Sequence, residues 1–244
     1  MAFPVALTLA AETAAAEKTF AEELIEEINC QTVFTIPIFG GIPVKESVVV
    51  TWILMAAILL FCFLMTRGFK VTNISKRQAF MEWAFKWIEN LVRDFIGEEG
   101  VQYVPYLVTV LLYIGIANIC GIFGFKPPTK DINVTAALAL MSIVLVQAAS
   151  IRHNRVGGWI KSFAKPTPIV TPINIMELAI RPLSLCMRLF GNVLGAFVIM
   201  KLIESLVPVG IPMVFSLYFD FFDGLLQAYV FVFLTSLFIK EGLE

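Results

Sequence analysis

Residues 174–207 read NIMELAIRPLSLCMRLFGNVLGAFVIMKLIESLV, an apolar run that also holds two arginines, Arg181 and Arg188, seven residues apart. Its pattern predicts one helix, which at 1.5 Å per residue would be roughly 50 Å long. That exceeds the roughly 30 Å hydrocarbon core of a bilayer, so such a helix must tilt strongly, bend or run partly in the interface. Pro182 offers one place for a bend.

The composition indicates a membrane protein. Of the 244 residues, 59% are hydrophobic and 15% are charged, whereas soluble domains are nearer half apolar and a quarter charged. A net charge of −1 provides no basic excess for nucleic acid. Four scattered cysteines and one histidine predict neither a disulfide framework nor a metal site, and we expect no cofactor.

Further membrane spans follow from runs without charge, because a spanning helix needs roughly 20 apolar residues. A turn at residues 207–212, VPVGIP, should separate the first long helix from a last one, and the two would form a tilted hairpin. The other predicted spans lie between Glu46 and Arg67, at 101–125, at 132–151 and, after the turn, at Met213–Ile239.

Residues 78–97 have a different pattern, with apolar side chains every three or four residues and charges between them. This pattern predicts an amphipathic helix on the cytoplasmic interface, and a helix packed on a soluble partner is the alternative. The apolar stripe consists of Phe80, Ala84, Trp87, Ile88, Leu91 and Phe95, and the opposing stripe of Glu82, Lys86, Glu89 and Arg93.

Basic residues predict the orientation. Two clusters without acids, at 67–77 and 152–165, follow the first and third spans, and the positive-inside rule places both in the cytoplasm. The amino terminus would then lie outside and the carboxyl terminus in the cytoplasm. We expect an all-α integral membrane protein with about five spans and one interfacial helix. It forms a single membrane domain, 1–244, in which 1–44 is an acidic extracytoplasmic segment and 45–244 the helical membrane region.

The last two helices hold seven charged side chains, which would cost roughly 20 kcal/mol if all faced lipid. Polar residues spaced by three and four form one stripe on the first of these helices. Glu177 and Arg181 can pair there as i, i+4 neighbours. Arg188 has no acid within one turn, so its partner must lie elsewhere. The stripe consists of Glu177, Arg181, Ser184, Arg188 and Asn192.

The last helix carries a second polar stripe, formed by Asp220, Asp223 and Gln227, which we interpret as a hydrated path. Beside Arg188, Gly191 and Gly195 form a small-xxx-small pair that lets another helix come close, either one of this chain or a partner's. Arginine keeps its charge when desolvated. It can therefore favour ionisation of a nearby carboxyl group and block the passage of cations; a static buried salt bridge is the alternative.

Three segments resemble subunit a of F-type ATP synthases. They are SLCMRLFGN at 184–192, GLLQAYVFVFLTSLFI at 224–239 and GFKPPTKDINVTAALAL at 124–140. The likeness runs from about residue 45 to the end. It implies a stator beside a rotating c-ring, with two half-channels for H⁺ or Na⁺, and a long tilted hairpin against the ring. Peripheral-stalk b subunits and membrane lipids are the other partners it implies.

The resemblance also implies residue roles. Arg188 matches the family's essential arginine, and Asn192, Asp220 and Gln227 match polar positions of the ion path. Glu177 matches a polar position near the half-channels, and Arg181 a basic position of less certain role. The chain departs from the pattern at Phe197, where some members carry glutamate or histidine, and at the additional carboxylate of Asp223.

The expected function is ion translocation coupled to rotation, in a bacterial plasma membrane. The sequence has no glycine-rich loop ending in Gly-Lys-Ser/Thr, so the subunit would be non-catalytic, with ATP chemistry on other subunits. A secondary ion transporter or antiporter subunit is the rival interpretation. Such transporters usually show paired repeats with broken helices, and no such repeat is visible here.

Overall fold

The computed structural model describes residues 32–36, 42–70, 74–123, 127–162, 171–206 and 210–243. The expected acidic segment at 12–27 lies outside these residues. Two strands, β1 (Thr32–Ile36) and β2 (Ile42–Lys45), precede the helices α2 (Glu46–Thr66), α3 (Lys76–Ile96), α4 (Val104–Ile119), α5 (Ile132–Ser162), α6 (Thr171–Leu206), α7 (Ile211–Ser216) and α8 (Gly224–Leu243). Shorter helical turns are η1 (Glu98–Tyr103), η2 (Cys120–Phe123), η3 (Pro128–Lys130) and η5 (Leu217–Asp223).

The expected all-α membrane architecture is confirmed. Within the described residues, five helical stretches are long and apolar enough to cross a membrane: Glu46–Thr66, Glu98–Ile122, Ile132–Arg155, Thr171–Leu206 and Pro212–Leu243. The buried core lies among α4, α5, α6 and α8 and includes Leu107, Ile114, Val146, Leu185, Leu189 and Phe231. In α2, by contrast, only Ser47 and Leu54 are buried, so nearly all of its apolar surface is left for lipid or a partner.

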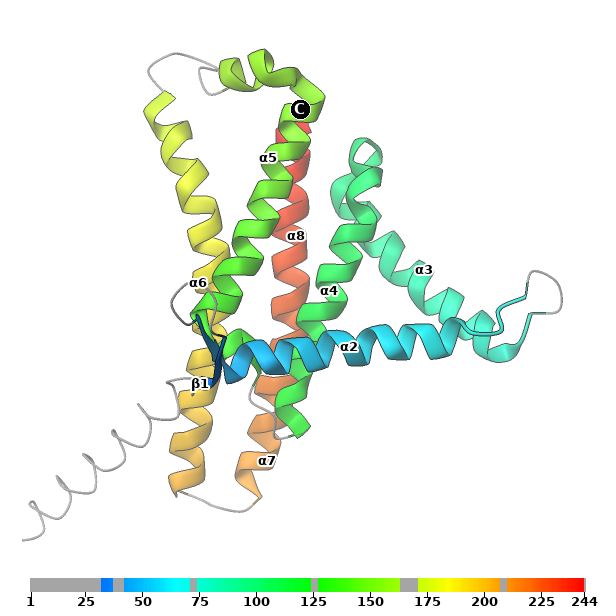
Figure 1. Cartoon of the computed structure of the whole chain (residues 1–244), viewed down its shortest axis with the longest axis vertical. Helices are drawn as coiled ribbons and strands as arrows, with labels where there is room; N and C mark the ends of the chain where they lie inside the picture. Colours follow the sequence, from blue (N-terminus) through cyan, green and yellow to red (C-terminus); the bar gives the residue numbers. More distant parts are fainter. Residues whose placement is uncertain are drawn as a thin grey trace, which may run out of the picture.

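The two long helices form the expected hairpin. Helix α6 has 36 residues, about 54 Å at 1.5 Å per residue, which is too long for an upright span. Helices α5, α6 and α8 run along the long axis of the molecule, while the axis of α2 runs across their direction (Figure 1). If α2 crosses the bilayer, α6 and α8 are strongly tilted within it.

Helix α3 corresponds to the amphipathic helix expected at residues 78–97; it begins at Lys76 and ends at Ile96. The Ser75 side chain caps it by accepting a hydrogen bond from the backbone N–H of Gln78. Its last turns pack on the bundle, since Val92 and Ile96 are buried. Four aromatic residues before these turns are more than half exposed, which suits contact with a membrane interface; they are Phe80, Trp83, Phe85 and Trp87.

Helical structure differs from expectation in two places. The cytoplasmic loop expected after residue 151 is helical as far as Ser162, with a break at Arg155, whose φ of 57° is unusual for a residue with a side chain. The last helix is not one α-helix, because Leu217–Asp223 is π-helical and joins α7 to α8. Side-chain periodicity does not reveal either feature, since both depend on contacts made by the folded chain.

A buried carboxylate joins the connection between α4 and α5 to the start of α2. Asp131 is 4% exposed, and its Oδ2 accepts a hydrogen bond from Ser47 Oγ at 2.6 Å and lies 3.7 Å from Lys45 Nζ. Its Oδ1 accepts from the backbone and side-chain N–H groups of Asn133 at 3.0 and 2.8 Å. Burial alone would raise the pKa of Asp131, but these hydrogen bonds and the ammonium hold that pKa below its ordinary value.

We predict that Asp131→Asn destabilises the detergent-purified chain by about 1–3 kcal/mol at neutral pH, because an amide offers one acceptor oxygen where the carboxylate offers two, and a buried donor is left unpaired. A depressed folded-state pKa stabilises the fold above the unfolded-chain value of about 3.9 and stops doing so as the pH falls through the folded-state value. The difference in melting temperature from wild type should therefore shrink in acid. Asp94→Asn, at an exposed position, is the matched control, and an equal effect there would contradict the assignment.

Candidate ion-path site

The polar stripe of α6 contains two arginines in contrasting environments. Arg181 is paired as expected, since its Nη2 donates to Glu177 Oε2 at 3.0 Å. The same nitrogen donates to Glu241 Oε1 of α8 at 2.6 Å, and the guanidinium lies over the Phe238 ring, 4.9 Å from its centroid. Arg181 therefore fastens the carboxyl-terminal part of α8 to α6.

Arg188 has no such neutralisation. It is half-buried, and among the described residues it makes neither a hydrogen bond nor an ion pair. Ser184, one turn earlier, and Asn192, one turn later, are exposed on the same stripe. A guanidinium among apolar side chains needs water or a carboxylate, and this part of the chain supplies no carboxylate.

The surface around Arg188 is open. A Cβ atom added at Gly191 or Gly195 would have no neighbour within 4 Å. The adjoining side chains are exposed and apolar; they are Leu183, Met187 and Ile199. Of the two packing alternatives for the glycine pair, contact with a helix from another chain is therefore the one that this surface leaves space for.

Asn192 and Gln227 connect this open surface to the interior. The Asn192 side chain donates to Gln227 Oε1 at 2.7 Å across the α6–α8 contact. Gln227 is 4% exposed, and its Nε2 has no hydrogen-bond partner within the described residues. A buried amide N–H without an acceptor is costly, so water or a passing ligand is the natural acceptor here.

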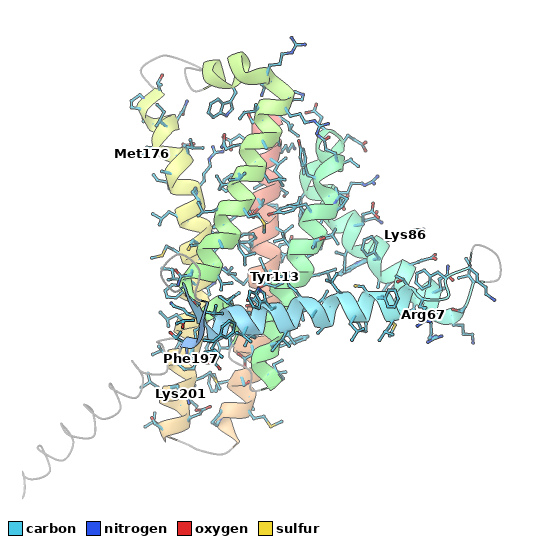
Figure 2. The ribbon with its side chains drawn as sticks, in the orientation of Figure 1. Arg67, Lys86, Tyr113, Met176, Phe197 and Lys201 are labelled. Carbon is cyan, nitrogen blue, oxygen red and sulfur yellow. The ribbon has the colours of Figure 1, made fainter. Side chains whose placement is uncertain are left out.

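Gln227 lines a cavity of about 330 Å³ between the hairpin and the end of α4. Both carboxylates of the expected ion path, Asp220 and Asp223, line it too. Figure 2 shows Phe197 and Lys201, which also line it, toward one end of α6, with Met176 toward the other end. The remaining lining residues are Asn118, Gly121, Pro127, Val193, Ala196, Met200, Glu204, Ser216, Phe219 and Gly224.

The two carboxylates are presented by the π-helical segment η5. Asp220 Oδ2 accepts a hydrogen bond from Ser216 Oγ at 2.6 Å, whereas Asp223 has no hydrogen bond or ion pair with the residues described. Short π-helical insertions often occur at functional sites. The shared α-helical face expected for Asp220, Asp223 and Gln227 is thus replaced by a π-helical turn, and all three side chains still reach one cavity.

Sequence reasoning did not select Asn118 and Gly121, which approach the cavity from α4 and η2. Asn118 accepts from Thr129 Oγ1 at 2.8 Å and donates to the Gly224 carbonyl at 3.1 Å. It is 4% exposed, and an amide in the middle of the uncharged run 101–125 was the available signal. Glu241 was also missed, because its pairing with Arg181 spans 60 residues.

Phe197 is a position at which the chain departs from the pattern that it resembles. Its ring lies 3.3 Å from Lys130 Nζ and 6.0 Å from Lys201 Nζ, measured to the centroid. Lys130 is 3% exposed, and Lys201 Nζ is 3.4 Å from Glu204 Oε2. A cation is attracted to the face of an aromatic ring. Phe197 therefore contributes packing and a cation contact to this wall of the cavity, and its ring has no group that could take up or release a proton.

Comparison with known proteins gives one family. Residues 48–240 match the family described as ATP synthase A chain. The chain is 36% identical over 204 residues to ATP synthase subunit a of Moorella thermoacetica, covering 83% of this chain and 92% of that protein. It is 35% identical to subunit a 1 of Pelobacter propionicus, over 82% and 88% of the two chains. It is 32% identical to the sodium ion specific subunit a of Propionigenium modestum, over 83% and 75%.

The contrast between the arginines predicts a difference in stability. Arg188→Ala should change the unfolding free energy of the detergent-purified chain by no more than about 0.5 kcal/mol, because no hydrogen bond or ion pair with the described residues is lost. Arg181→Ala removes two ion pairs to partly exposed glutamates and should cost about 1 kcal/mol. Thermal melting of the two variants beside wild type measures this. An equal or larger loss for Arg188→Ala would reveal a partner within the chain.

Proposed function

Since the chain belongs to the ATP synthase A-chain family, we propose that it is the ion-translocating stator subunit of a rotary ATP synthase. In this role it carries H⁺ or Na⁺ through two half-channels and couples that flow to rotation of a c-ring and to ATP synthesis. One observation carries the proposal. Half-buried Arg188 has no described partner and lies on an open helix surface, one turn from an asparagine that contacts a cavity-lining glutamine.

The outer half-channel is the cavity of Asp220, Asp223 and Gln227. An ion reaches the carboxylates there and passes along the Gln227–Asn192 pair to the open surface of α6. Amide groups suit this step because they can donate and accept hydrogen bonds without being charged themselves. The ion then neutralises a carboxylate of the ring.

Arg188 controls the charge of that ring carboxylate. Its permanent positive charge favours the ionised form of a nearby carboxyl group and repels cations that would leak from one half-channel to the other. A ring site that has taken up its ion is neutral and can enter lipid, where only the ionised form is strongly disfavoured. The open glycine surface at Gly191 and Gly195 lets a ring helix pass close to the guanidinium.

The inner half-channel lies toward the other end of α6. Glu177 and Ser184 are exposed there, and Arg181 holds Glu177 and Glu241 beside each other. The ion released at Arg188 leaves past these groups to the cytoplasm. The membrane potential supplies about 2.3 kcal/mol per charge per 100 mV, which biases the direction of transfer.

The positive-inside rule places the basic ends of α2 and α5 in the cytoplasm, and with them the carboxyl terminus. The amino terminus is then outside, in a bacterial plasma membrane. The subunit is non-catalytic and holds no cofactor. ATP chemistry takes place on other subunits, and peripheral-stalk b subunits and lipids cover surfaces that the ring does not.

The coupling role predicts that Arg188→Ala and Arg188→Lys both lose ion-driven ATP synthesis in vesicles holding the whole complex. Alanine removes the charge, and lysine replaces a planar, permanently charged group by a more strongly hydrated one that neutralises when desolvated. ATP hydrolysis by the catalytic sector, measured after it is detached from the membrane, should be unchanged. Near-normal coupled synthesis with Arg188→Ala would contradict the proposal and favour the secondary-transporter interpretation.

The open surface predicts a second effect. Gly191→Leu should fold normally, because its Cβ meets nothing within 4 Å, yet it should reduce coupled synthesis at least tenfold by obstructing the ring helix. Gly157→Leu is the matched control, since Gly157 is also exposed with open space around its Cβ but belongs to α5 and not to α6. Equal activity of the two variants would show that no partner passes Gly191.

A further inference from the structure

Within the cavity, Asp220 is the carboxylate held in place from two sides. Ser216 lies four residues earlier, and its hydroxyl donates to Asp220 Oδ2 at 2.6 Å. On the other side, a Cβ built at Gly121 of η2 would be 2.8 Å from Asp220 Oδ1 and 3.0 Å from its Cγ. No Cβ approaches another atom so closely without something shifting, so the absence of a side chain at position 121 is what leaves room for this carboxylate.

We propose that Ser216 and Gly121 are positioning residues for Asp220, acting together to aim its carboxylate into the outer cavity. The inference rests on the proposed function and deepens it, because it says how one group of the outer path is oriented. The π-helical turn η5 is part of the arrangement, because it brings two carboxylates to the cavity. Asp220 accepts the Ser216 hydrogen bond, whereas Asp223 has no hydrogen bond with the described residues. Neither Ser216 nor Gly121 needs to contact the ion.

The other cavity groups do not perform this task. From α6 the cavity receives Lys201 and Glu204, which lie 3.4 Å apart as an ion pair. From α4 it receives Asn118, whose amide is occupied by Thr129 and the Gly224 carbonyl. Asp220 is thus oriented by the Ser216 hydroxyl and by the space at Gly121. A freely rotating carboxylate would offer its oxygens to the ion for less of the time.

The test uses the whole complex in vesicles under a fixed membrane potential. ATP synthesis is measured as the concentration of H⁺, and in a second series Na⁺, is varied on the extracytoplasmic side while the cytoplasmic side is held constant. The two sides are then exchanged. Ser216→Ala should shift the extracytoplasmic concentration for half-maximal synthesis by about two- to tenfold, as expected for one lost hydrogen bond, and leave the cytoplasmic dependence within twofold of wild type. Ser216→Thr keeps the hydroxyl and should restore the wild-type dependence.

Gly121→Ala should shift the extracytoplasmic dependence in the same direction as Ser216→Ala. Its matched control is Gly115→Ala, because a Cβ at Gly115 of α4 meets only ordinary contacts, at 3.7 Å from Leu225 and 3.9 Å from Ala228. Ser205→Ala serves the same purpose for the serine, since Ser205 is exposed and its one hydrogen bond with the described residues is to the Leu202 carbonyl, in its own helix. Both controls should behave as wild type.

Three results would overturn the inference: an unchanged extracytoplasmic dependence in Ser216→Ala, an equal change on both sides, or no rescue by threonine. If Ser216→Ala prevents assembly of the complex, Gly121→Ala decides, and failure of both to assemble assigns these residues a structural role instead. Asp220→Asn separates this inference from the proposed function. Lost synthesis there with normal Ser216 and Gly121 variants rejects only the positioning, whereas full activity of Asp220→Asn rejects the outer path itself.

Discussion

The arrangement depends on a positive charge that the described part of the chain leaves unpaired. A guanidinium remains charged when desolvated, and a charge in hydrocarbon costs several kcal/mol unless water or an opposite charge meets it. Arg181 shows the ordinary solution, with two glutamates and an aromatic ring around it. Arg188, two turns further along the same helix, is left half-buried on an open surface. That difference makes Arg188 suited to meet a carboxylate that arrives and departs.

The rest of the hairpin provides the route by which an ion could reach that surface. Gln227 of α8 lines the cavity, Asn192 is exposed on α6, and the hydrogen bond between these two side chains connects the cavity to the open surface. Both amides are neutral, so they can stand beside the guanidinium without neutralising it. Asn118 joins α4 to Thr129 of η3 and to Gly224 of α8 by hydrogen bonds, which fixes one wall of the cavity. The path is therefore supported by α4, η3, α6 and α8.

The cavity remains polar although Phe197 supplies no ionisable side chain to it. The Phe197 ring lies near two ammonium groups, those of Lys130 and Lys201, while the carboxylates come from η5 in the other arm of the hairpin. Extra backbone in a π-helical turn changes which side chains face inward. Two carboxylates three residues apart can then reach one cavity, although among the described residues only Asp220 of the two accepts a hydrogen bond.

Local pattern was sufficient for the membrane helices, because hydrophobicity and charge along 20 residues decide whether a segment enters a bilayer. It was likewise sufficient for the Glu177–Arg181 pair, which lies within one turn of helix. The sequence alone therefore determined the five spans, the amphipathic α3 and the isolation of Arg188 from acids of its own helix. Only the tertiary structure decided the Arg181–Glu241 ion pair, the Asn192–Gln227 contact, the space at Gly121 and the β-strand pair before α2. Each joins residues far apart in the chain, or depends on backbone geometry that packing imposes, and neither leaves a periodic signal in the sequence.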